Sequence, residues 1–65
     1  MSLAVDMHNV VMNSQTANSF GFHLLKLIRG ADSHNRDLLR KVFPNAVAVY
    51  DNYVETGKII ELEYD

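Results

Sequence analysis

Three histidines, His8, His23 and His34, and eight Asp or Glu residues are the side chains of this 65-residue chain that could bind a metal ion or transfer protons. Two histidines that share a zinc ion from one helix are typically four residues apart. No two histidines of this chain have that spacing, and it contains no cysteine to supply a thiolate ligand or a disulfide. We therefore expect no metal site and no cofactor.

Nucleophilic chemistry has equally little support in the sequence. Ser14, Ser19 and Ser33 lie in polar stretches where a hydroxyl group caps a helix, and no strand-turn-helix motif of a nucleophilic serine surrounds them. The three glycines are isolated from one another, so the sequence has no glycine-rich loop for phosphate. We expect a protein that is not an enzyme.

Basic side chains gather in one part of the chain, because five of the six Lys and Arg residues lie between residues 26 and 41. On two neighbouring helices they would form a candidate basic face for phosphate groups, made of Lys26, Arg29, Arg36 and Arg40. The net charge is −2, and the helix expected to enter a DNA groove, residues 45–55, is acidic. A nucleic-acid-binding regulator is therefore the alternative function and not the favoured one.

The segment that must organise these side chains is residues 20–31, FGFHLLKLIRGA. At 100° per residue, Phe20, Leu24 and Leu27 fall on one face and Lys26 on the other, which predicts a helix over about residues 17–30. Such a short helix is marginal alone and needs other segments against its apolar face. The residues that could cap it are Ser14, Thr16, Asn18 and Ser19.

Two further helices are predicted over about residues 33–43 and 44–56. Asp32 or Ser33 would cap the first of them, and Pro44 would end it and begin the next. Gly57 would end the last helix in a left-handed conformation. The core expected from the three apolar faces is Leu24, Leu27, Leu38, Val42, Phe43, Val49 and Tyr53.

Both ends of the chain alternate apolar and polar residues. This pattern predicts a short strand or a frayed end over residues 3–8. Over residues 58–64, Ile60, Leu62 and Tyr64 alternate with Glu61 and Glu63, which predicts an extended segment or strand. A continuation of the third helix is the alternative. A strand would need residues 3–8, a second copy or a ligand chain as its partner.

We therefore expect one mainly α domain over residues 1–65, with three helices and short extended or strand segments at its N- and C-termini. A chain of 65 residues buries little apolar surface, so a homodimer would add stability. Phe22 does not fit the apolar face of its helix and either packs under residues 3–12 or contacts another protein. The candidate interface consists of Phe22, Ile60, Leu62 and Tyr64.

Three stretches, LLKLIRGAD, NRDLLRKVFPNAV and YDNYVETG, resemble small uncharacterised helical proteins of bacteria and their prophages. The resemblance covers about residues 20–57, in which Leu38, Phe43, Pro44, Val47 and Tyr50 form a helix-corner-helix pattern. It implies a bacterial or phage origin and transfers no functional residue.

The chain has no apolar run near the roughly 18 residues of a membrane span and no secretory signal pattern, so we expect a cytoplasmic protein. The favoured function is that of a non-enzymatic interaction or accessory protein that self-associates.

Overall fold

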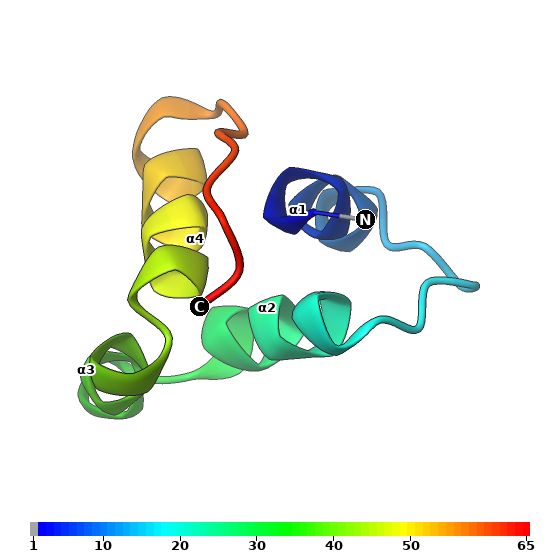
Figure 1. Ribbon diagram of the computed structural model, residues 1–65. Coiled ribbons are helices and arrows are strands. Elements are labelled where there is room, and N and C mark those ends of the chain that lie inside the picture. Colours follow the sequence, from blue (N-terminus) through cyan, green and yellow to red (C-terminus); the bar gives the residue numbers. More distant parts are fainter. Residues whose placement is uncertain (1) are drawn as a thin grey trace.

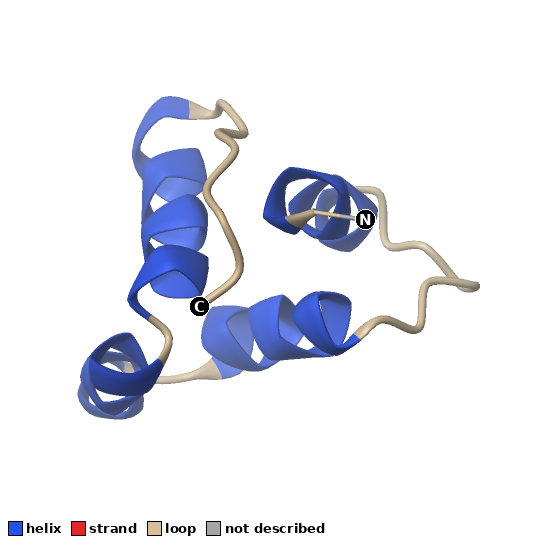
Figure 2. Cartoon of the chain, viewed as in Figure 1, coloured by secondary structure: helices blue, strands red, loops and turns tan. Residues whose placement is uncertain are grey.

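Four α-helices and a C-terminal extension make up the protein (Figure 1). The structure is a computed structural model and describes residues 2–65. The helices are α1 (Leu3–Val11), α2 (Phe20–Gly30), α3 (Ser33–Val42) and α4 (Pro44–Thr56). Between residues 2 and 65 the chain forms helices and loops but no strand (Figure 2). The prediction of a mainly α fold is confirmed, whereas the prediction of three helices with strand segments is wrong.

The core lies where α1, α2 and α4 meet. These three helices pack against one another, and α3 packs on α4. Figure 1 shows α2 running beneath α1 and α4, with α3 at the corner where the chain turns from α2 into α4. Among residues 2–65, the buried apolar side chains come from α1, α2 and α4 and are Leu3, Met7, Val10, Phe22, Leu24, Leu25, Ile28, Ala46, Val47 and Val49.

The N-terminal segment is a helix and not the predicted strand. Leu3, Met7 and Val10 are all buried, at spacings of four and three residues that match one face of a helix. Val5, which a strand would place on the same side as Leu3, is 51% exposed. Ser2 caps α1 by accepting a hydrogen bond from the Val5 N–H group. The pattern of apolar residues in this short segment is compatible with a strand and with a helix. The packing of Leu3, Met7 and Val10 in the core favours the helix.

The apolar arc of α2 is wider than the surface that its neighbours cover. Leu25 and Ile28 are fully buried, and Phe22 is 3% exposed in the same cluster as the apolar residues of α1, which confirms that it packs under the N-terminal segment. The other half of the arc faces solvent, with Phe20 70% and Leu27 58% exposed. The predicted burial of Leu27 is therefore wrong, because α2 turns a different part of its arc toward the core.

The predicted core residues of α3 are also exposed. Leu38 is 47% and Val42 65% exposed, and α3 has no buried residue. Phe43 and Tyr53 are only partly buried, whereas the predicted burial of Leu24 and Val49 is confirmed. The side chain by which α3 packs against the core is the partly buried Leu39.

The predicted helix ends agree closely with the structure. Ser19 caps α2, and Asp32 caps α3 by accepting a hydrogen bond from the Asn35 N–H group at 2.8 Å. Pro44 is the first residue of α4, and Gly57 ends that helix with a φ of 75°. Local capping chemistry predicted the boundaries at Asp32, Pro44 and Gly57. Ser19 was one of four possible caps of α2, which begins three residues after the predicted start at residue 17.

The C-terminal segment is extended but has no strand partner. Its carboxylates cap two helices: Glu61 accepts a hydrogen bond from the Ala4 N–H group at 2.9 Å, and Asp65 accepts from Asn45 and Ala46 at 2.8 and 3.0 Å. Phe43, at the N-cap position of α4, offers no side-chain cap of its own. Asp65 therefore supplies the negative charge that the N-terminus of α4 favours. These contacts replace the strand ladder that the alternating pattern suggested.

Candidate interaction surface

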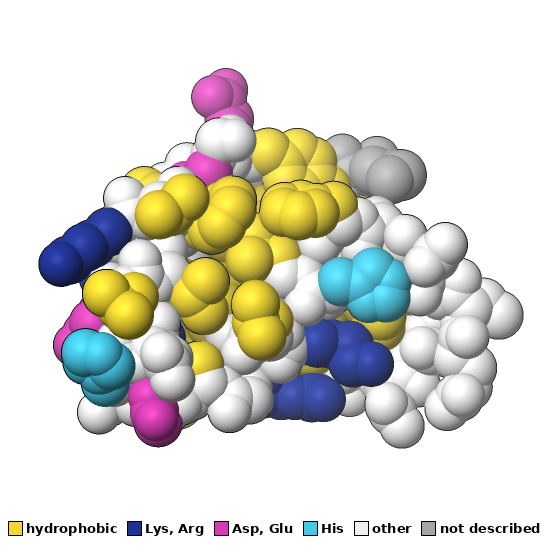
Figure 3. Space-filling view, turned by 90° about the horizontal axis from the view of Figure 1, so that it is seen from below, with side chains coloured by type: hydrophobic (Ala, Val, Ile, Leu, Met, Phe, Trp, Pro, Cys, Tyr) yellow, Lys and Arg dark blue, Asp and Glu magenta, His cyan; other side chains and the backbone are white. Residues whose placement is uncertain are grey.

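Apolar side chains gather on one face of the molecule, over α2 and α3 (Figure 3). Four of them, Phe20, Leu27, Leu38 and Val42, are between 47% and 70% exposed. We call these four, with the partly buried Leu39 and Phe43, the α2–α3 surface. A contiguous apolar patch on a small domain is typical of a contact region for another molecule.

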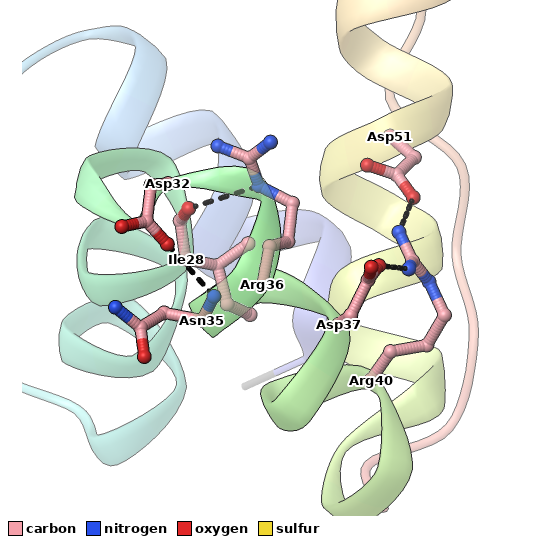
Figure 4. Close-up of polar contacts among 7 residues, drawn as sticks. All are labelled: Ile28, Asp32, Asn35, Arg36, Asp37, Arg40 and Asp51. Atoms are coloured by element: carbon pink, nitrogen blue, oxygen red, sulfur yellow. Dashed lines mark hydrogen bonds and ion pairs between the residues drawn. The ribbon is translucent and has the colours of Figure 1, made fainter.

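Polar contacts attach α3 to its neighbours (Figure 4). The apolar side chains of Leu38 and Val42 stay exposed. The Arg36 guanidinium donates to the carbonyl groups of Ile28 and Ala31 at 3.3 and 2.6 Å, and it lies 5.1 Å from the centre of the Tyr50 ring. Arg40 pairs with Asp51 of α4 at 2.8 Å. These arginines attach α3 to α2 and α4, so the position of α3 does not depend on burying Leu38 or Val42.

The α2–α3 surface contains two hollows. A cavity of about 280 Å³ lies at the N-terminal end of α2, walled by Phe20, Leu24, Phe43 and Tyr64. A groove of about 610 Å³ separates α2 from α3. The residues along this groove are Lys26, Leu27, Gly30, Ala31, Asp32, Asn35, Leu38 and Leu39. The α2–α3 surface is therefore uneven, with aromatic rings that project beside two recesses.

The predicted basic face is not assembled as one patch of free charges. Arg36 is directed at backbone carbonyl groups, and Arg40 is paired with Asp37 and Asp51, which raise the pKa of its guanidinium. Lys26 borders the α2–α3 groove, whereas Arg29 borders a different hollow beside α1 and α4. The Lys26 Nζ also lies 5.2 Å from the centre of the Phe22 ring. Three of the four predicted residues therefore have contacts within the chain, and Lys26 and Arg29 face different hollows.

The predicted interface residues are distributed between core and surface. Phe22 is buried, and Leu62 is partly buried against the core. Ile60 and Tyr64 remain 37% and 48% exposed. Tyr64 is engaged within the chain through the hydrogen bond of its hydroxyl group to Asp6. Phe20, Leu27 and Val42 of the α2–α3 surface are more exposed, at 58% to 70%.

A buried polar cluster joins α1, α2 and the C-terminal segment. Asp6 is 2% exposed and accepts hydrogen bonds from the Ser19 hydroxyl at 2.7 Å and the Tyr64 hydroxyl at 2.8 Å. Ser19 in turn accepts from the Phe22 N–H group at 3.1 Å. The sequence reasoning missed this cluster, because Asp6 is recognisable as buried only once residues 3–11 are placed in a helix. Its hydroxyl groups are committed to holding three segments together.

Raising the pH above 10 is expected to weaken this cluster. Partial burial, followed by the hydrogen bond to Asp6, raises the pKa of Tyr64 to about 12, and the Asp6 and Glu61 charges act in the same direction. The phenol has an ordinary pKa of 10.0 in the unfolded chain, so its stabilising contribution is complete below pH 10 and is lost as the pH rises toward 12. Urea denaturation between about pH 9 and about pH 12 measures the effect.

Tyr64→Phe should flatten that decline in the free energy of unfolding, because the variant has no phenol at this position to ionise. Tyr53→Phe is the matched control, since no hydrogen bond of the Tyr53 hydroxyl links it to Asp6. An equal decline in the wild-type protein and in Tyr64→Phe would contradict the assignment.

No family model matches the chain, and no match was found among curated proteins or solved structures.

Within residues 2–65, no group of three or more His, Cys, Asp or Glu side chains is arranged to hold a metal ion. None of the described helices has both the length and the apolar character required to cross a membrane. The α2–α3 surface is therefore the strongest candidate site that the geometry offers.

Proposed function

We propose that this chain is a non-enzymatic interaction module that pairs with a second copy of itself through the α2–α3 surface. The observation that carries the proposal is α3, an amphipathic helix with no buried residue, whose exposed apolar side continues the exposed half of the α2 arc. Soluble domains that leave such a face open generally cover it with a partner.

The size of the surface suits a small homodimer. The exposed parts of Phe20, Leu27, Leu38 and Val42 amount to roughly 350 Å² of apolar area per copy. About 60% of an interface is apolar, so two such patches correspond to roughly 1,200 Å² of total buried surface. That value lies at the lower end of stable interfaces, and we expect association in the micromolar range.

The charges around the surface favour a copy of this chain over a strongly charged partner. Lys26 and Asp32 both border the groove, and Asp37 and Arg40 of α3 already neutralise each other. Because the edge of the surface carries both positive and negative charges, it does not attract an acidic polymer strongly. It also does not repel the same surface on a second copy. In a two-fold symmetric dimer, each protomer presents the same positive and negative side chains to the other protomer.

Val42→Asp is expected to raise the dimer dissociation constant by at least about tenfold, because each protomer would bury a carboxylate in an apolar contact. Val54→Asp is the matched control. Val42 and Val54 are both valines that are 65% exposed near the C-terminal end of a helix, but Val54 lies on α4 away from the α2–α3 surface. Sedimentation velocity from low to high micromolar concentration measures both variants.

The expected result is a concentration-dependent dimer for the wild-type protein and for Val54→Asp, and a monomer for Val42→Asp. A wild-type protein that stays monomeric at high micromolar concentration would contradict the proposal. Equal weakening by the two substitutions would show that the contact lies elsewhere.

A further inference from the structure

We propose that Phe20 of each protomer inserts its ring into the α2–α3 groove of the partner. This inference rests on the proposed self-association and specifies its central contact. It begins with Phe20, which is 70% exposed and whose ring contacts one other aromatic ring, that of Phe43, at 6.0 Å and a tilt of 53°. The ring therefore projects from the first turn of α2.

The groove is open because two small residues lie where α2 ends. Gly30 has no side chain, and a Cβ atom built on it would have no neighbour within 4 Å. Ala31 adds only a methyl group beside it, while Leu27 and Leu38 supply apolar walls. No described side chain of the same protomer, within residues 2–65, fills this space of about 610 Å³. An apolar ring is the group that such walls would stabilise most.

The spacing along α2 allows both rings to insert at once. Phe20 and Leu27 lie seven residues apart on one side of the helix, which is about 10 Å. A two-fold axis passing near Leu24 makes the two α2 helices antiparallel and brings each Phe20 over the partner's Leu27. One surface then carries both the projection and its recess, as a symmetric two-fold interface requires.

A double-mutant cycle tests this contact. Phe20→Ala removes the ring, and Gly30→Leu fills the groove at a position where an added side chain meets open space within the protomer. Each single change is expected to raise the dimer dissociation constant by about tenfold or more. In the Phe20→Ala background, Gly30→Leu should have little further effect, because the ring that it would exclude is already absent.

Sedimentation equilibrium measures the four constants, and circular dichroism verifies that each variant stays folded. Independent effects of the two substitutions, or tighter association of Gly30→Leu, would overturn the insertion of Phe20 while leaving the dimer through the α2–α3 surface intact. A monomeric wild-type protein would overturn both proposals. Val54→Asp again serves as the control for a change outside the surface.

Discussion

Leu25→Ala is expected to lower the free energy of unfolding by about 2 to 5 kcal/mol, whereas Leu27→Ala should change it by less than about 1 kcal/mol. Leu25 is fully buried between α1, α2 and α4, and Leu27 is 58% exposed on the same helix. A domain of this size has only a few kcal/mol of stability to lose, so the Leu25 variant should be largely unfolded at room temperature.

Urea denaturation followed by circular dichroism measures both variants, at protein concentrations low enough to keep them monomeric. The pair is informative because both substitutions remove the same atoms within one turn of the same helix, from a buried and from an exposed side. A Leu27→Ala variant that lost more stability than Leu25→Ala would show that α2 is rotated relative to the arrangement described above.

Gly21→Ala should destabilise the protein by about 2 to 3 kcal/mol, although alanine is the better helix former. A Cβ atom at this position would overlap the Asp6 carboxylate and lie 3.1 Å from the Tyr64 ring. Asp6 is held by the hydroxyl groups of Ser19 and Tyr64, so moving it breaks two buried hydrogen bonds.

Gly30→Ala is the control for this substitution, because it makes the same chemical change in the same helix where nothing lies within 4 Å. It should be neutral or stabilise the protein by up to about 1 kcal/mol. Thermal melting of both variants distinguishes the two effects. Equal melting temperatures would show that α2 does not approach α1 as closely as the structure indicates.

Local signals in the sequence were sufficient to predict the last three helices, although they left four residues open as the cap of α2. Ser19, Asp32, Pro44 and Gly57 act through hydrogen bonds and backbone preferences of their own neighbourhood, so their roles do not depend on the rest of the fold. The first helix was missed because alternation over six residues cannot separate a strand from one turn and a half of helix. Ser2, its cap, was not considered as a helix start.

Side-chain burial was less predictable than helix position. The predicted apolar face of α2 contains Leu24 and Leu27 but not Phe22, whereas the side that faces the core contains Leu24 and Phe22 but not Leu27. The side of α2 that faces the core is determined by packing against α1. A strand or frayed end over residues 3–8 does not offer this packing surface, so the prediction could not include it. The same limitation concealed the Asp6 cluster and the helix-capping role of the C-terminal carboxylates.

The contacts between Ala4 and Glu61 and between Asp6 and Tyr64 span 57 and 58 residues of sequence. During synthesis α1 leaves the ribosome long before the groups that complete its first turn and satisfy its buried carboxylate. The docking of α1 on α2 does not require these distant residues, but the two hydrogen bonds do, and closing so long a loop is entropically costly. We therefore expect both contacts to form late in folding, after the packing of α1 on α2.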